Sequence, residues 1–391
     1  MLDWLIVGGG LHGTHLALTL LARGGANPAR LRILDPHAAL LAHWERCTTR
    51  TGMAFLRSTV VHHLAPDPHD LWIFARRRGS LTGQFRGPYR RPALALFQAH
   101  CAELIATYGL DQLHLRGRAT GLRRARHGWC VETSQGAIAT RRVLLALSAG
   151  EQPRWPAWAT ALRAAGGPIA HLYGDEASNE QPAPGGPTVV IGGGISAAQL
   201  AMALARRVPG GVTLLLRHDL RVEPFDSGPC WLGPKCLSGF HAEPRPERRR
   251  AMIRAARNPG SVPEDVARSL RRAERWGLLR TQRGEVLATT RRADGAVSLQ
   301  LDEGNLTAAH IVLATGFDPA RPGGTWLDDA IAAEGLALAP CGYPLIDRRL
   351  CWAPGLYVTG GLAELELGPP ARNIAGARHA GERLAALALA L

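Results

Sequence analysis

The sequence predicts an α/β fold made of two units of parallel strands and helices, with the second unit inserted into the first. Three observations lead to this prediction. A glycine-rich turn between an apolar strand and a helix occurs at residues 5–13 and again at residues 189–197. An apolar strand that ends in glycine closes each half, at residues 142–150 and 310–316. A short strand–turn–strand stretch precedes each closing strand, so the two halves repeat the same order of parts.

The first glycine-rich turn has the spacing of a dinucleotide-binding fingerprint. Gly8, Gly10 and Gly13 form Gly-x-Gly-x-x-Gly, and Asp35 ends the apolar strand that follows the helix. Glycines at these places allow a tight turn, the approach of a pyrophosphate to the backbone and close packing of helix on strand. The helix N-terminus attracts phosphates, and an acid at the end of the second strand accepts hydrogen bonds from a ribose. We expect a dinucleotide here; the alternative is a glycine-rich turn without a ligand.

The second turn repeats the pattern with two differences. Gly192 and Gly194 take the first two places, but Ala197 replaces the third glycine. The next apolar strand ends in Arg217 instead of an acid, and Arg221 follows closely. An arginine there attracts the 2′-phosphate that distinguishes NADP from NAD. The pattern favours NADP, although in a chain so rich in arginine Arg217 could equally be a solvated side chain.

A resemblance to known flavoproteins follows from these motifs and the C-terminal part of the chain. Ala-Thr-Gly-Phe at residues 314–317 ends a strand, and Leu-Tyr-Val-Thr-Gly at residues 356–360 precedes the final helix. With the two fingerprints, they resemble the flavoproteins that have two Rossmann-like dinucleotide-binding domains in a glutathione-reductase-like fold. The order Trp44, Met53, Arg57 is similar to that in single-component flavin monooxygenases of the siderophore ornithine/lysine N-hydroxylase branch.

The resemblance implies FAD and NADPH as cofactors and hydroxylation of a small molecule through a C4a-hydroperoxyflavin. Ala309 departs from the family, which often has an aspartate there. An NADPH-dependent reductase or dehydrogenase with a non-oxygen acceptor, or a non-catalytic redox sensor, therefore remains an alternative. The candidate FAD residues are Gly8, Gly10, Gly13, Asp35, Trp44, Gly360, Arg372 and Asn373, and the candidate NADP residues are Gly192, Gly194, Ser196, Ala197, Arg217, Arg221, Thr315 and Gly316.

Two further residues are candidates for catalysis. Arg57 matches the basic residue of the resembled family, and His62 could lie near the flavin. His62 and His63 are adjacent, so on a strand their side chains would point to opposite faces and could not bind one metal ion together. The alternative for His62 is structural packing. No metal site is expected.

The length of 391 residues suits two domains. We expect a FAD-binding domain made of residues 1–165 and 305–391, and an NAD(P)-binding domain over residues 166–304. Residues 240–277 have the pattern of a helical insertion in the second domain, and Pro263 suits the first turn of a helix. The arginines of this segment favour a solvated face, the alternative being the steering of an anionic substrate.

Charge, cysteine usage and hydropathy limit the possible partners. The net charge is +14, but Lys235 is the single lysine, which is typical of codon bias more than of a nucleic-acid-binding protein. The seven cysteines form no Cys-x-x-Cys and no disulfide framework, and we expect Cys230 and Cys236 to be loop cysteines that face a substrate cleft or a core and have no redox role. No apolar run reaches the roughly 18 residues of a membrane span. We expect a soluble cytoplasmic enzyme for a small, possibly anionic substrate, without nucleic acid or membrane partners.

We predict that Arg217→Ala weakens NADPH and leaves NADH nearly unchanged. A charge-assisted hydrogen bond contributes about 1.5–3 kcal/mol, which is roughly ten- to a hundredfold in binding. Rates of flavin reduction, measured against the concentration of each nucleotide at several salt concentrations, test this. Equal losses for both nucleotides would make Arg217 a solvated side chain.

Overall fold

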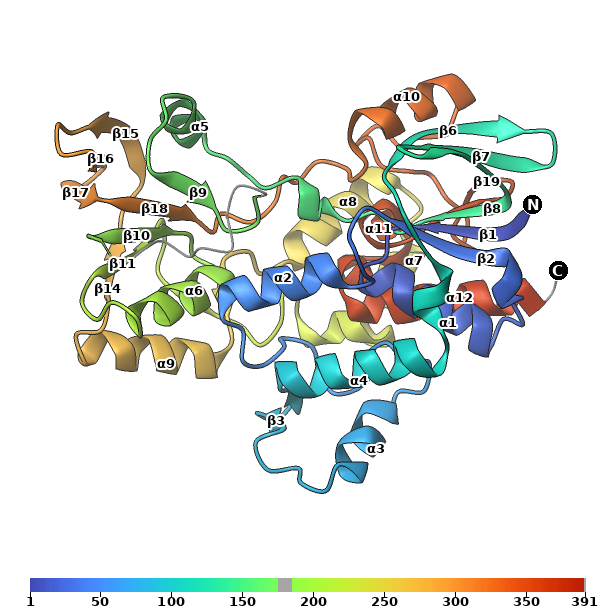
Figure 1. The fold of residues 1–391 in the computed structure, drawn as a ribbon, viewed down its shortest axis with the longest axis horizontal. Helices are drawn as coiled ribbons and strands as arrows, with labels where there is room; N and C mark the ends of the chain where they lie inside the picture. Colours follow the sequence, from blue (N-terminus) through green and yellow to red (C-terminus); the bar gives the residue numbers. More distant parts are fainter. Residues whose placement is uncertain (175–184, 390–391) are drawn as a thin grey trace.

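The first unit of the computed structural model is built on an eight-stranded sheet (Figure 1). The structure describes residues 1–174 and 185–389. Neighbours β20, β8, β1, β2 and β5 run parallel, and their apolar runs are covered on both faces, as in α/β proteins. The strands of this sheet are β1 (Leu2–Val7), β2 (Leu31–Asp35), β5 (His114–Arg116), β6 (Ala119–Ala125), β7 (Gly128–Thr133), β8 (Gly136–Leu145), β19 (Cys351–Ala353) and β20 (Leu356–Val358).

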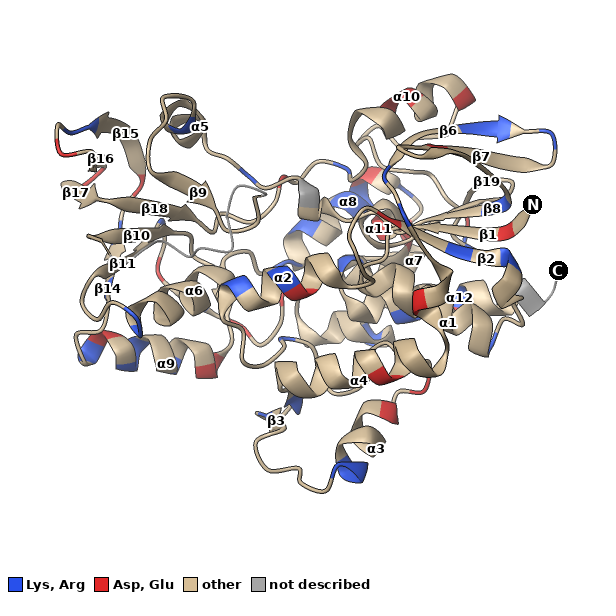
Figure 2. Ribbon diagram, viewed as in Figure 1, with Lys and Arg blue, Asp and Glu red and all other residues tan. Residues whose placement is uncertain are grey.

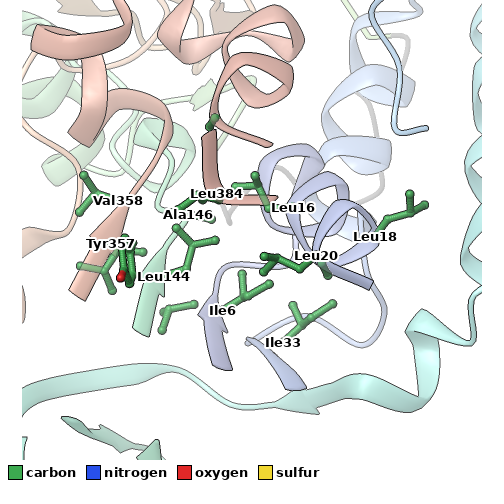
Figure 3. Packing of buried hydrophobic residues seen from close by; sticks show 14 of the residues in the cluster. Ile6, Leu16, Leu18, Leu20, Ile33, Leu144, Ala146, Tyr357, Val358 and Leu384 are labelled. Carbon is green, nitrogen blue, oxygen red and sulfur yellow. The ribbon is translucent and has the colours of Figure 1, made fainter. Parts of the chain in front are cut away.

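Helices from both ends of the chain cover this sheet. The helix after the first fingerprint, α1 (Leu11–Ala22), packs against the C-terminal helix α12 (Ile374–Leu389). Figure 3 shows Leu20 of α1 near Ile6 and Ile33 of the sheet, and Leu16 beside Leu384 of α12, in one apolar core. The other elements of this unit are η1 (Pro28–Arg30), α2 (Ala42–Thr51), α3 (Asp70–Arg77), β3 (Phe85–Arg86), β4 (Arg91–Pro92), α4 (Leu94–Thr107), η2 (Leu110–Leu113), η3 (Ala149–Glu151), α10 (Gly324–Glu334), η5 (Gly360–Ala363), α11 (Glu364–Leu367) and η6 (Pro369–Arg372).

The second unit repeats this design on a five-stranded sheet with the order β14-β11-β10-β18-β9, all parallel. The helix after the second fingerprint, α6, packs against α9, and an antiparallel meander of β15, β16 and β17 joins the unit (Figure 1). Its elements are α5 (Ala157–Ala164), β9 (Ile169–His171), β10 (Thr188–Ile191), α6 (Ile195–Ala205), β11 (Val212–Leu216), α9 (Glu264–Arg275), β14 (Arg280–Arg283), β15 (Val286–Arg291), β16 (Val297–Leu301), β17 (Asn305–Ala308) and β18 (His310–Leu313).

A helical segment between β11 and α9 leaves the second unit and packs on the first. Its helix α8 contacts α11 and η6, and its turn η4 also contacts η6. This segment therefore joins the two units beside the start of α12. It consists of β12 (Arg221–Val222), η4 (Pro229–Leu232), α7 (Pro234–Ala242), α8 (Pro246–Ala256) and β13 (Ser261–Val262).

Three details differ from the sequence-based expectation. β17 and β18 belong to the second unit, whereas the expected boundary at residue 304 leaves both with the first. The helix α9, expected as part of an insertion, packs on α6 as a helix of the second unit. Cys230 and Cys236, expected as loop cysteines without a redox role, form a disulfide with 5.4 Å between their Cα atoms. The physical reason is the fold of η4 and α7, which places the two residues on adjacent turns.

The arginines at residues 245–275 separate into two groups. Figure 2 shows basic residues along α9, where Arg268 and Arg271 have side chains 70% and 56% exposed. On α8, by contrast, the Arg250 side chain is only 10% exposed. The expected solvated face therefore describes α9 and not the inner side of α8. No helix in the described ranges is long and apolar enough to cross a membrane.

We predict that Gly13→Ala destabilises the protein although the change lies inside a helix, where alanine is normally favoured. A Cβ on Gly13 would lie 1.8 Å from the Gly8 carbonyl oxygen, so the free energy of unfolding should fall by about 3 kcal/mol or more. Gly10→Ala is the matched control, because its Cβ meets nothing within 4 Å. The control should cost less than about 1 kcal/mol. Urea unfolding followed by tryptophan fluorescence compares them, and equal stabilities would contradict the packing argument.

Candidate functional site

The first fingerprint forms an open cradle at the carboxyl end of β1. Gly8 has a φ of 112°, a conformation that favours glycine, and its carbonyl oxygen leaves no room for a side chain at Gly13. In front of Gly10, however, the space is empty to at least 4 Å from an added Cβ. The cradle therefore has room for a phosphate at the amino end of α1, where the helix dipole favours negative charge.

Asp35 connects this cradle to the end of β2. Its Oδ2 accepts a hydrogen bond of 2.7 Å from the Gly9 backbone N–H, and its Oδ1 accepts bonds of 2.9 and 2.8 Å from the backbone N–H and Nδ1 of His37. The carboxylate is thus held in place by the turn that it stabilises. Because a carboxylate has about four acceptor positions, a ribose hydroxyl could still bind it.

A cavity of about 410 Å³ opens next to His37, between the two units. Its wall in the first unit comes from segments that follow the carboxyl ends of β2, β5 and β8, and this wall is rich in cationic and imidazole groups. A basic cavity with aromatic side chains suits an adenosine diphosphate group. The lining comprises His37, His43, Arg46, Arg118 and Gly150 of the first unit and Pro153, Trp155, Arg163, His171, Tyr173 and Gly174 on the opposite side.

His12 links the first fingerprint to the C-terminal segment. Its Nε2 donates a 3.0 Å hydrogen bond to the Asn373 carbonyl, and its Nδ1 lies 3.1 Å from the Thr359 hydroxyl, which donates to it. Burial lowers the pKa of His12 to about 4, so the ring is neutral at physiological pH. His12 therefore fixes the start of α12 against the cradle without adding a charge.

The remaining predicted FAD residues lie at different depths around this cradle. Gly360 has a φ of 64°, and its added Cβ would lie 3.7 Å from Nδ1 of His12. The Asn373 side chain accepts a bond of 3.3 Å from the Gly376 backbone N–H and so caps α12. Trp44 packs against Phe97 in the core, with 5.3 Å between the ring centroids. Arg372 points to a buried ion pair instead of the cradle.

The second fingerprint is more crowded than the first. Gly192 has a φ of 154°, and a Cβ on it would lie 2.4 Å from the Ala314 carbonyl oxygen. Ala197 is fully buried. A Cβ on Gly194 would lie 3.8 Å from the Gly260 Cα, so the loop before β13 lies next to the amino end of α6. The second cradle is therefore present, and the loop before β13 forms a wall beside it that the first cradle does not have.

Polar and aromatic residues meet beside the first turn of α6. Tyr173 donates a 2.5 Å hydrogen bond to the Ser196 hydroxyl and stacks on Phe317, with 4.7 Å between the ring centroids. Thr315 donates to the Arg154 carbonyl and accepts a 3.1 Å bond from Nε2 of His171. Ser196, Thr315 and neighbouring Gly316, whose φ is 78°, therefore lie around the second cradle as the sequence predicts.

The two arginines predicted for the 2′-phosphate are exposed at the end of β11. Neither Arg217 nor Arg221 lines the cavity of about 210 Å³ at this edge of the sheet. Arg271 and Arg283 line it instead, together with the acids Asp219 and Glu274. Arg283 ends β14, which pairs with β11, so Leu216 and Arg283 are neighbours in the sheet.

Arg57 does not face an open site. Its guanidinium donates hydrogen bonds to the backbone carbonyls of Glu223, Pro224, Phe225 and Ser261, and one of 2.8 Å to the Ser261 hydroxyl. All three nitrogens are thus engaged by the helical segment of the second unit. This geometry gives Arg57 a structural part, as a clamp between the units, in place of the expected catalytic one.

His62 and His63 point to different surroundings, as their adjacency predicts. His63 is fully buried, donates to the Pro68 carbonyl through Nε2 and accepts from the Ala65 backbone N–H through Nδ1. His62 faces α12, where burial, and then the nearby charge of Arg378, lowers its pKa to about 4. His62 is therefore neutral at physiological pH, and its part in catalysis stays a prediction.

Three residues near the cradles escaped the sequence analysis. His12 was visible as a polar residue inside the first fingerprint, and Arg283 as an arginine that ends a strand. Tyr173 had no local signal, because its contacts with Ser196 and Phe317 join distant parts of the chain.

Comparisons with known proteins agree with this geometry. Residues 5–150 match the family model described as FAD-NAD(P)-binding. No curated protein sequence matches the chain.

Solved structures similar to the whole chain include the ornithine N-hydroxylase of Kutzneria sp. 744, at 19% identity, 99% coverage of both chains and a TM-score of 0.77. The L-lysine 6-monooxygenase of Pseudomonas syringae has 20% identity, 99% coverage of both chains and a TM-score of 0.75. The reduced ornithine hydroxylase of Pseudomonas aeruginosa has 16% identity, covers 100% of this chain and 99% of its own, and has a TM-score of 0.77. The predicted fold class is confirmed, because the whole chain has the fold of these solved structures.

We predict that Arg57→Ala lowers the free energy of unfolding by about 2–4 kcal/mol, because buried carbonyls lose a charged donor. Arg57→Lys should not restore stability, since a lysine cannot reach so many acceptors with one ammonium group. Arg248→Ala, on an arginine with a side chain 63% exposed, is the control and should change stability by less than about 0.5 kcal/mol. If Arg57→Ala has normal stability but its flavin is reduced slowly, Arg57 has a catalytic role and the structural interpretation is wrong.

Proposed function

We propose that this protein is a FAD-dependent, NADPH-using monooxygenase that hydroxylates a small molecule. The observation that carries the proposal is the pair of glycine cradles, each at the carboxyl edge of its own parallel sheet. Ligands of such sheets bind at these edges. The similarity of the whole chain to amine and amino-acid hydroxylases supports the same reaction class.

FAD fits the first cradle. Its pyrophosphate would lie in front of Gly10, its adenosine ribose at Asp35, and its adenosine diphosphate half along the basic cavity beside Arg46. Gly360 and Asn373 would then face its other half. The bound flavin would supply hydride acceptance and the activation of oxygen.

NADPH fits the second cradle. Because Gly192, Gly194 and Ala197 are small, a pyrophosphate could approach the backbone closely. Ser196 offers a hydroxyl at the N-terminus of α6. Thr315 and Gly316 would lie beside the part of NADPH that extends toward the flavin. Arg217 and Arg221 would attract its 2′-phosphate. Arg271 and Arg283 supplement them, because they line the cavity at the same edge.

The residues of the chain hold these two sites in a fixed relation. Arg57 ties the first unit to residues 223–225, and buried Arg91 pairs with Asp265 at 2.5 Å, between β4 and α9. Units held in this way would let the nicotinamide and the flavin meet without a search. The neutral His12 positions the start of α12 in this arrangement.

The proposal includes a cytoplasmic location. NADPH is available there as the electron donor.

The two cradles make separable predictions. The purified protein should be yellow and release FAD on denaturation. Gly10→Val should abolish flavin binding, because its side chain fills the space of the pyrophosphate. Gly194→Val should keep the flavin and block its reduction by NADPH. In the wild type, NADPH oxidation should consume oxygen, and mass spectrometry with ¹⁸O₂ should find the label in the product of a responsive amine or amino acid.

Circular dichroism of both variants is the control for folding. A colourless protein that cannot be reconstituted with FAD contradicts the proposal, as does loss of flavin from both folded variants. Reduction of another acceptor with no incorporation of oxygen would make the protein a reductase.

A further inference from the structure

Three arginines converge on one buried glutamate where α8 meets α11. Glu364 is 0% exposed, and its Oε2 accepts from Arg372 Nε at 2.7 Å and from Arg257 Nη2 at 3.4 Å. Arg250 contacts the other oxygen, Oε1. We call these four residues the arginine cluster. One carboxylate thus faces three guanidinium groups.

The neighbouring polar groups do not balance this charge. The Tyr343 hydroxyl accepts from Arg250 at 3.0 Å and from Arg372 at 2.9 Å, and it donates to the Pro319 carbonyl, so its hydrogen-bonding positions are occupied. Glu366, the next acid along α11, is itself shared between Arg249 at 3.1 Å and Arg383 at 2.9 Å.

Asp226 is the remaining acid that acts on Arg257, and it acts on Arg57 as well. Burial, and then the nearby charge of Arg372, lowers the pKa of Arg257 to about 10, so the group is still charged at physiological pH. With Asp226 shared, the cluster keeps at least one positive charge more than its acids offset. A buried charge without a partner is costly, and an anion would offset that cost.

The cluster lies between the two cradles. Arg372 directly precedes Asn373, whose carbonyl accepts the bond from His12 in the first fingerprint. Arg257 lies in the loop that leads to Gly260, which is next to Gly194 in the second fingerprint. A molecule bound at the cluster would therefore lie near both cradles.

The cluster also has unused donors that can be reached from outside. The side chains of Arg257 and Arg372 are 27% and 24% exposed. Arg372 Nη1, and Nε and Nη1 of Arg257, donate to no residue in the ranges that the structure describes. Two guanidinium groups with free N–H groups form a fork that fits a planar carboxylate.

We propose that the substrate carries a carboxylate and that Arg257 and Arg372 bind it. This inference rests on the proposed function, since it assigns the substrate class of the same enzyme. Glu364 holds the two guanidinium groups in position, and the substrate carboxylate takes up the charge that Glu364 leaves uncompensated.

The test is a titration of the FAD-loaded protein with glutarate, and with its uncharged diamide as a control, at constant ionic strength and without NADPH. Calorimetry should detect glutarate but not the diamide. Arg257→Gln and Arg372→Gln should each weaken glutarate binding about ten- to a hundredfold, which corresponds to one charge-assisted hydrogen bond. Arg248→Gln, an exposed change on α8, should leave it unchanged.

Thermal unfolding separates ligand binding from a structural role. Glutarate should raise the Tm of the wild type, because it binds the folded state only. It should not raise that of Arg257→Gln. In buffer without glutarate, Arg257→Gln should melt no lower than the wild type, since it removes part of an excess charge. If Arg257→Gln does not fold, Arg257→Lys keeps the charge, loses the fork and should bind glutarate more weakly than the wild type.

Each other outcome overturns the assignment. Absence of glutarate binding, or equal binding by Arg257→Gln and Arg248→Gln, removes the carboxylate site. Competition of glutarate with NADPH, and an equal loss of NADPH affinity in Arg257→Gln, would assign the arginines to a cofactor phosphate. Because no turnover is measured, glutarate binding that depends on these arginines would stand even if the protein failed to oxidise NADPH.

Discussion

The close approach of α1 to β1 determines where the rest of the first unit can lie. Only a glycine at position 13 lets the helix come so near the Gly8 carbonyl, and this contact aims the helix N-terminus at the sheet edge. With α1 fixed, α12 packs against it, and a Cβ on Gly381 would lie 2.9 Å from the His15 ring. His12 then reaches Asn373, so the C-terminal segment is placed at the cradle by a contact made at the start of the chain.

The second unit meets the same constraint in a looser form. Ala197 holds the place of the third glycine, and its methyl group lies 3.2 Å from a Cβ added at Gly192. The second turn is also approached by residues from outside the fingerprint: Gly260 lies next to Gly194, and His218 lies next to Gly193. The same fingerprint therefore gives one open cradle and one walled by the helical segment. Through Arg57, that segment also ties the two units together.

The parts of the structure that could be predicted are those encoded by neighbouring residues. The glycine spacing and the apolar strands were sufficient for both cradles, because turn geometry and helix packing impose them locally. The partners of Arg57 could not be predicted, since they lie far along the chain at residues 223–261. The place of β18 was missed for a similar reason: only its pairing with β10 and β9 assigns it to the second sheet.

The environment of the arginines of α8 could not be predicted either, because it depends on charged residues that are distant in the sequence. By composition, a run of arginines is a solvated face, and on the surface such charges contribute little because water and salt screen them. What distinguishes Arg250 is Glu364, which is distant in sequence and fully buried.

Arg91, another buried arginine, pairs closely with the carboxylate of Asp265. A second acid beside Glu364 would have balanced the arginine cluster in the same way and stabilised the fold. Natural proteins depart from such local balance mainly at functional sites. The surplus at Arg257 and Arg372 is therefore better explained by an anion that arrives with the substrate than by the stability of the ligand-free chain.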